Sequence, residues 1–447
     1  MKDIFLKKSI PQIIQAVKLK KLNLDEVLKE SLNKYEKYNN KINSWKFFEK
    51  RKIKKKFSDS QNKYDLKTNS DLEGIPFGIK DIFNTIDFKT EMGSKIWKNF
   101  TPGNNARVVD CLEGSGAIAM GKNETAEFAV HKLGKTKNPH NKFKTPGTSS
   151  SGSASAVCTG DVPFSLASQT AASIIRPASY CGVWGMKPSF GLIPRVGVLK
   201  TNDTLDTIGF ITSNLFNLDI ILENTRLRGL NHPYIYKNID KKKIKQKNKI
   251  KIGFLETDLC LNTKNYIKDS VENFLSKISK NKNFLIKKIT WPEHLNRIDN
   301  VHQTIYDKSL AYYFNKEYEK KNLSRIMKEI IKRGRKVKSK KFVEAIHNQE
   351  NIIKKVDRLL EGYDIVFTYS ASSSAINRNE TELSDSSLIW TMAHVPSINI
   401  PFEKCPNQMP YGIQAIARKW SDFKLIKSLE KIEAEGLIGS TNLKLNP

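Results

Sequence analysis

A stretch of small residues at positions 145–188 constrains the fold of this chain more than any other feature. It reads TPGTSSSGSASAVCTGDVPFSLASQTAASIIRPASYCGVWGMKP. Small side chains let the backbone approach other groups closely, and exposed hydroxyls between them are candidate nucleophiles. The serines at 149–151 and the isolated Ser173 are therefore the first candidates for chemistry.

A second feature lies upstream, at residues 74–81, which read GIPFGIKD. Lys80 ends this apolar, Gly- and Pro-punctuated run, where a charge would be costly to bury without a purpose. Two interpretations are open from the residues alone. Burial can lower the pKa of Lys80 and make it a base, or Lys80 can form a structural ion pair with Asp81 or another carboxylate.

These motifs resemble those of the amidase signature family, serine hydrolases that act on carboxamides with a Ser-Ser-Lys triad. The resemblance covers roughly residues 8–435 and includes CGVWGMKP at 181–188 and MPYGIQ at 409–414. It places the lysine at Lys80, the middle serine at Ser149 and the nucleophile at Ser173. The resemblance thereby favours Lys80 as a base.

The resemblance also implies a mechanism. Lys80 takes a proton from Ser149, Ser149 takes one from Ser173, and the Ser173 oxygen attacks the amide carbonyl to form an acyl-enzyme. In the family, a cis peptide precedes the middle serine. The oxyanion is expected to meet the backbone N–H groups of Thr170, Ala171, Ala172 and Ser173.

Two further residues are candidates for supporting roles. Ser150 shares the serine loop and can either join the proton relay or cap the helix that follows. Arg176 can bind a substrate carboxylate, although a scaffold role for the loop is favoured.

The chain departs from the family pattern near the serines. Thr148 stands where glycine is usual, Ala171 and Ala172 replace more common glycine-containing pairs, and Gln169 stands where many members have aspartate. A positive φ at Thr148 or Ala172 would strain a residue that carries a Cβ. These departures from the family pattern therefore bear on the catalytic efficiency of the protein and not on its fold.

The alternation of short apolar runs with helical periodicity predicts an α/β fold, a single large mixed β-sheet covered by helices on both faces. We expect one amidase domain over residues 1–447, with a helical N-terminal arm at 8–60, a signature core at 74–215 and a variable, mostly helical substrate-side region at 265–390. Residues 51–71 are charged and aperiodic, which predicts a surface connection. Residues 237–251 are lysine-rich and predict an exposed linker.

Composition narrows the class of protein. The formal net charge is +30, but the lysines are spread along the chain without aromatic interleaving, so a nucleic-acid partner is not expected. The five cysteines are scattered, without CxxC or His-paired spacing, so neither a disulfide framework nor a zinc site is expected. No metal or organic cofactor is implied. No uncharged run of eighteen apolar residues or secretory signal occurs, and a cytoplasmic location is expected.

The seven histidines lie in unlike contexts, and we interpret each as a surface or structurally bonded residue. The substrate pocket is expected to involve residues 300–390. Four aromatic residues there are candidates for lining it, but core packing is favoured for each: Tyr306, Tyr312, Tyr313 and Trp390.

Three functions compete. The favoured one is a free amidase that acts on a small carboxamide, with a homodimer as an option. The second is the glutamine-hydrolysing component of a tRNA-dependent amidotransferase, its A subunit, which would require partner subunits. The doubled isoleucine after Ser173 departs from the Ser-Ile-Arg order of that component, which favours the free enzyme. The third is a catalytically weak or inactive binding protein on the same fold.

Overall fold

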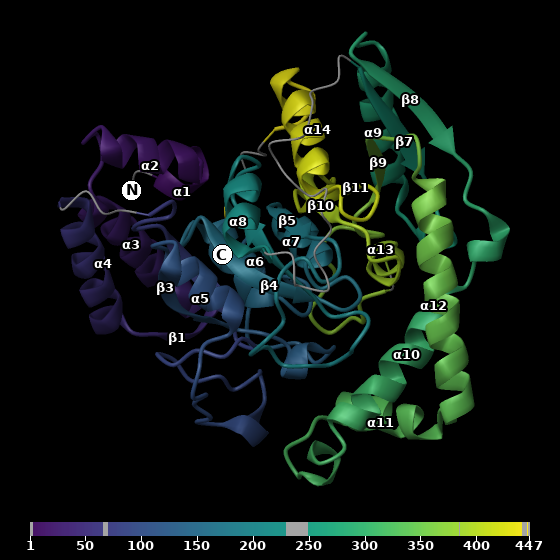
Figure 1. Ribbon diagram of the computed structural model, residues 1–447, viewed down its shortest axis with the longest axis horizontal. Helices are drawn as coiled ribbons and strands as arrows, with labels where there is room; N and C mark the ends of the chain where they lie inside the picture. Colours follow the sequence, from purple (N-terminus) through teal and green to yellow (C-terminus); the bar gives the residue numbers. More distant parts are fainter. Residues whose placement is uncertain (1–2, 66–69, 229–248, 384, 440–444, 446–447) are drawn as a thin grey trace.

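A single eleven-stranded sheet forms the centre of the computed structural model, which describes residues 3–65, 70–228, 249–383, 385–439 and 445. The strand order is β1-β3-β2-β4-β6-β5-β10-β11-β9-β7-β8, with helices packed around it (Figure 1). Parallel and antiparallel pairs both occur. The predicted α/β fold with one mixed sheet is therefore confirmed.

The strands nearest the serine loop are fully buried, which is why they read as apolar runs instead of alternating patterns. In the parallel part of the sheet, β2 (Pro76–Lys80) lies between β3 (Ile118–Asn123) and β4 (Phe164–Gln169). β3 continues past Gly121 to Asn123. The other strands are β1 (Trp45–Phe48), β5 (Trp184–Lys187), β6 (Thr207–Thr212), β7 (Ile250–Leu255), β8 (Phe284–Ile289), β9 (Ile365–Tyr369), β10 (Ser397–Lys404) and β11 (Pro410–Ile416).

The N-terminal arm consists of α1 (Ile4–Lys7), α2 (Ile10–Lys18), α3 (Leu24–Ile42) and α4 (Lys50–Asp65), at one end of the molecule (Figure 1). Ser9 and Asn23 cap α2 and α3 through capping boxes. The prediction of an aperiodic connection at residues 51–71 is wrong, because α4 covers most of it. α4 buries only a narrow stripe that includes Ile53 and Phe57, so its many charges concealed the helical period.

Helices rich in small residues pack closely on the sheet beside the serine loop. α6 (Ser151–Thr159) is buried along its whole length. A Cβ on Gly152 would lie 2.4 Å from the carbonyl oxygen of Ser44 and 2.5 Å from the backbone nitrogen of Glu124, so glycine is required there. α7 (Ile175–Cys181) packs against α6. Further helices are α5 (Arg107–Gly114), α8 (Asn217–Thr225) and α14 (Asp422–Ala434).

The region at 265–390 is mostly helical, as expected, but also contributes β8 and β9 to the sheet. Its helices are α9 (Asn265–Ser279), α10 (Ile298–Tyr313), α11 (Arg325–Lys336), α12 (Ser339–Leu359) and α13 (Ser387–Met392). α10, α11 and α12 lie at the end of the molecule opposite the N-terminal arm (Figure 1). Most of the predicted linker at 237–251 falls outside the described residues.

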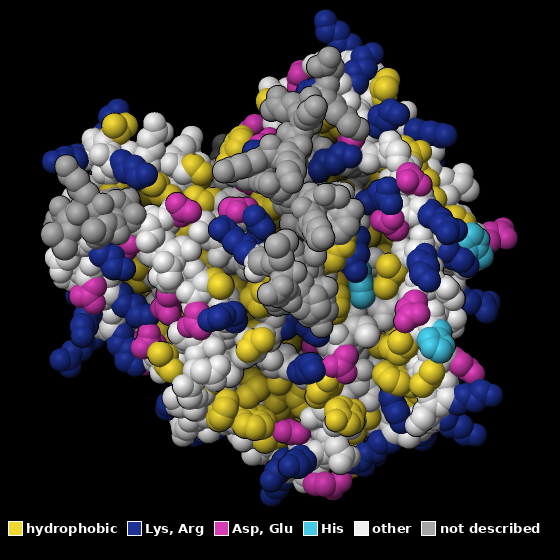
Figure 2. Space-filling model, in the orientation of Figure 1, with side chains coloured by type: hydrophobic (Ala, Val, Ile, Leu, Met, Phe, Trp, Pro, Cys, Tyr) yellow, Lys and Arg dark blue, Asp and Glu magenta, His cyan; other side chains and the backbone are white. Residues whose placement is uncertain are grey.

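Basic side chains are scattered over the face drawn in Figure 2 and do not gather into one stripe there. All five cysteines are unpaired, and four of them are buried. Among the described residues, no helix combines the length and the apolar character needed to span a membrane.

Candidate active site

Lys80 lies at the end of β2 and is completely buried. Its Nζ is 2.7 Å from Ser149 Oγ, 3.0 Å from Ser150 Oγ and 2.9 Å from Ser168 Oγ. Sequence reasoning missed Ser168. The position of Ser168 near the end of β4 could have indicated that it lies close to Lys80. β2 and β4 run parallel, so their carboxyl ends lie at the same edge of the sheet. Three hydroxyls thus surround one amine.

Burial lowers the pKa of Lys80 from its usual 10.5 to about 7, and the nearby Asp206 carboxylate partly opposes this shift. The alternative ion pair with Asp81 does not form. Asp81 instead lies 3.0 Å from the Nζ of Lys122, which is also buried. Because Lys122 neutralises Asp81, Lys80 is left with hydroxyl neighbours in place of a carboxylate.

Ser149 and Ser150 begin the turn into α6. The peptide between Thr148 and Ser149 is cis, as the resemblance implied. Gly147 has a φ of 88°, whereas neither Thr148 nor Ala172 has a positive φ, so the anticipated strain does not arise. Ser150 occupies the N-cap position of α6, but its side chain does not cap the helix and contacts Lys80 instead.

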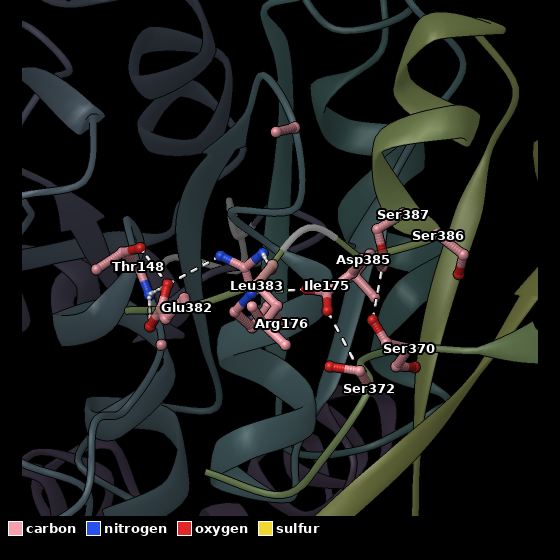
Figure 3. Close-up of polar contacts among 12 residues, drawn as sticks. Thr148, Ile175, Arg176, Ser370, Ser372, Glu382, Leu383, Asp385, Ser386 and Ser387 are labelled. Atoms are coloured by element: carbon pink, nitrogen blue, oxygen red, sulfur yellow. Dashed lines mark hydrogen bonds and ion pairs between the residues drawn. The ribbon is translucent and has the colours of Figure 1, made fainter. Parts of the chain in front are cut away.

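A buried carboxylate, Glu382, holds the residue before Ser149 (Figure 3). The backbone nitrogen of Thr148 donates to Glu382 Oε1 at 3.0 Å, and the Thr148 hydroxyl donates to Oε2. Glu382 also accepts a hydrogen bond from Thr145 Oγ1 at 3.2 Å. The hydroxyl and amide of Thr148, at a position where glycine is usual, therefore both fix the serine loop to the segment before α13.

Arg176 joins the same network (Figure 3). Its Nη1 donates to Glu382 at 2.8 Å, its Nε to Asp385 at 2.6 Å and its Nη2 to the carbonyl of Leu383 at 2.7 Å. All three guanidinium nitrogens are thus engaged by the protein. This arrangement favours the scaffold role of Arg176 over binding of a substrate carboxylate.

Ser173 is half-buried and lies between β4 and α7, where it lines a cavity of about 100 Å³ together with Thr170, Ala171 and Ala172. Among the described residues, its hydroxyl has no hydrogen-bond partner. Gln169 holds this loop. Its Oε1 accepts from the backbone nitrogens of Ile174 at 2.8 Å and Ile175 at 3.1 Å.

The opposite wall of this cavity comes from α10 and α11. His302, Tyr306 and Arg333 line it, and His302 Nε2 lies 2.9 Å from the carbonyl oxygen of Thr170. Burial lowers the pKa of His302 to about 4, so its imidazole is neutral at pH 7. Tyr306 lines this cavity and also packs in the buried core, as favoured from the sequence. Tyr312 is 75% exposed and is not a wall residue of the cavity, so core packing is wrong for it.

A larger cavity of about 350 Å³ adjoins the first, and the two share Ala129 and Thr170 in their walls. Its other wall residues lie mainly at 190–201 and 206–208. Residues 300–390 contribute to the wall of the smaller cavity and not to that of the larger one, and their part in the substrate pocket stays a prediction. Among the described residues, no group of three His, Cys, Asp or Glu side chains is suited to hold a metal ion.

Comparisons with known proteins bear on the fold and the family of this chain. The family model described as Amidase matches residues 26–426. The A subunit of glutamyl-tRNA(Gln) amidotransferase from Staphylococcus aureus is 27% identical, over 96% of this chain and 97% of the relative. The native peptide amidase from Stenotrophomonas maltophilia superposes with a TM-score of 0.85 at 18% identity, over 99% of this chain and all of that one.

The corresponding glutamyl-tRNA(Gln) amidotransferase component from Thermotoga maritima gives a TM-score of 0.81 at 22% identity, with 99% of each chain covered. At such identities the structural likeness shows the fold. The family model, in contrast, spans most of the sequence and includes Lys80, Ser149 and Ser173. The chain therefore belongs to the amidase family.

Proposed function

We propose that this protein is an amidase that hydrolyses a carboxamide C–N bond to a carboxylic acid and ammonia or an amine, through an acyl-enzyme on Ser173. The observation that carries the proposal is the setting of Lys80. It is a completely buried amine with a pKa of about 7, placed 2.7 Å from the hydroxyl of Ser149. A lysine in this setting is neutral often enough at pH 7 to act as a base.

In the proposed reaction, Lys80 Nζ accepts the Ser149 proton while Ser149 Oγ accepts the proton of Ser173. The Ser173 oxygen then bonds to the carbonyl carbon, and the oxyanion meets the backbone N–H groups of residues 170–173. Ser149 returns a proton to the leaving nitrogen as the C–N bond breaks. Water hydrolyses the acyl-enzyme by the same relay.

Neighbouring residues would support this relay. Ser150 and Ser168 accept hydrogen bonds from Lys80 Nζ and would orient it. Arg176 would act through Glu382, which holds Thr148 next to Ser149. We also infer that residues 1–447 act as one amidase domain, because β1 near one end and β11 near the other belong to the same sheet.

A fluorophosphonate probe tests the nucleophile. We expect the probe to label the wild type and Ser373→Ala, but not Ser173→Ala. Release of ammonia from a panel of aliphatic and aryl amides then tests turnover. A wild type that is neither labelled nor active would instead favour the binding-protein alternative.

A second candidate is the glutamine-hydrolysing component of an amidotransferase. It is favoured by the relative from S. aureus, which carries the name of such a component, is 27% identical and aligns with nearly the whole chain. Ile174 and Ile175, the doubled isoleucine after Ser173, favour the free enzyme. Glutaminase activity that appears only with a co-purifying second protein would reverse this preference.

A further inference from the structure

The larger cavity has an unusual combination of size and chemistry beside the proposed site. It lies against Ser168, which contacts Lys80, and against Thr170 of the loop that carries Ser173. Much of its remaining wall is apolar: Phe190, Ile193, Val196, Val198, Leu199 and Ile208. A volume of about 350 Å³ is in the range of pockets that bind small organic ligands.

The polar groups of this wall bond to one another. Asp206 Oδ1 accepts hydrogen bonds from Thr170 Oγ1 at 2.7 Å and from Thr201 Oγ1 at 2.6 Å. Asp206 Oδ2 accepts from the backbone nitrogens of Thr201 at 2.8 Å and Asn202 at 2.9 Å. The carboxylate is thus satisfied by four donors and has little need of a polar ligand.

The basic residues at this cavity are also occupied. Arg195 donates to the backbone oxygens of Asn202 and Asp203, each at 2.9 Å. Lys200 pairs with the carboxylate of Asp203 at 2.9 Å. A polar ligand would have to compete with these contacts, whereas a hydrocarbon group would not.

The smaller cavity differs in both size and polarity. At about 100 Å³ it is lined by His131, Gln303, Tyr306 and Arg333, among others. The group that enters it must therefore be small. Gln303 Nε2 and the Nε and Nη2 atoms of Arg333 already donate to Asp307, so a polar group would bind to the remaining polar atoms of this wall. The two cavities meet at Ala129 and Thr170, beside the proposed nucleophile.

We propose that the substrate is an amide with an apolar group of ~four or more carbons on one side of the C–N bond and a small polar group, or none, on the other. The apolar group lies in the larger cavity. This inference rests on the proposed amidase function and adds the substrate class.

Two series of amides test it. One contains primary amides of linear acids from acetamide to octanamide, and the other contains N-alkyl acetamides from methyl to hexyl. We expect kcat/KM to rise by roughly fourfold per methylene over at least four carbons in one series, because each buried methylene favours binding by about 0.8 kcal/mol. The series that rises tells whether the apolar group is on the acyl or the nitrogen side.

Variants that fill the larger cavity test whether the apolar group binds there. Val198→Trp should reduce the rise per methylene to less than 1.5-fold, about the limit of a detectable trend. Val343→Trp, on the exposed face of α12, should leave the rise as in the wild type. Val196→Trp gives a second filling variant at a 69% exposed position, where folding tolerates a large side chain better. Thermal melts check that each variant is folded.

The outcomes separate this inference from the proposed function. If fluorophosphonate labels Ser173 but kcat/KM stays flat in both series, the inference is wrong and the amidase proposal stands. A rise that persists unchanged in both folded filling variants also overturns it. If the wild type is not labelled and hydrolyses no amide, both proposals fail.

Discussion

The pH dependence of nucleophile activation offers the sharpest check on the role of Lys80. If neutral Lys80 is the base, the reaction rate follows the neutral fraction of its side chain. With a pKa of about 7, this fraction is roughly one tenth at pH 6, about half at pH 7 and about nine tenths at pH 8. The rate of fluorophosphonate labelling should thus rise about ninefold between pH 6 and pH 8.

Other groups at the site do not produce the same profile. Burial lowers the pKa of His302 to about 4 and also lowers the pKa of His131. The His302 imidazole is already neutral through the pH range of the measurement, and the pKa of His131 lies below that of a free imidazole. A midpoint near pH 7 would therefore report on Lys80.

A variant tests the direction of the shift. The negative charge of Asp206 raises the pKa of Lys80, so Asp206→Asn should move the midpoint of the labelling profile to lower pH. Lys80→Arg, which stays charged, should lose labelling across the range. A labelling rate that is constant from pH 6 to pH 8 in the wild type, or unchanged in Lys80→Arg, would refute Lys80 as the base.

Three further predictions concern the surroundings of Lys80. Ser168→Ala removes one of three hydroxyls that favour the charged amine, so the labelling midpoint should shift to lower pH with less than tenfold loss of maximal rate; a midpoint at higher pH would contradict this. Glu382→Gln removes the charge paired with buried Arg176 and should lower the free energy of unfolding, measured by urea denaturation, by about 1–3 kcal/mol. A denaturation curve with the same midpoint and slope as that of the wild type would show that this ion pair does not stabilise the fold. His302→Asn should keep the pH profile of labelling, since neutral His302 is not the base, and loss of the rise between pH 6 and pH 8 would reassign that role.

Several features of the fold were readable from the residues because they depend on local patterns. Uninterrupted apolar runs predicted buried strands such as β2 and β4, and small residues after the serine loop predicted a helix, which is observed as α6. α4 escaped prediction because only a few of its side chains are buried, and a stripe that narrow gives little periodic signal among charges.

The sequence likewise identified some features of the site, and others became visible only in the structure. Sequence alone identified Lys80, Ser149 and Ser173 as residues to examine, since motifs record which residue types stand at fixed positions. It left the ionic partner of Lys80 open. Only the packing of β2 against β3 showed that Lys122 forms an ion pair with Asp81, so that Lys80, among the described residues, contacts hydroxyl groups and no carboxylate.

Contacts between distant segments were decided by tertiary structure. The bond from Thr148 to Glu382 joins residues 234 positions apart, and the bond between His302 and Thr170 spans 132. The chain itself thus determined the buried strands and the reactive groups they carry. Only the tertiary structure decided which carboxylates, imidazoles and cavities surround those reactive groups. Long-range packing removes the groups from water, and burial and neighbouring charge, not residue type, set the pKa of each one.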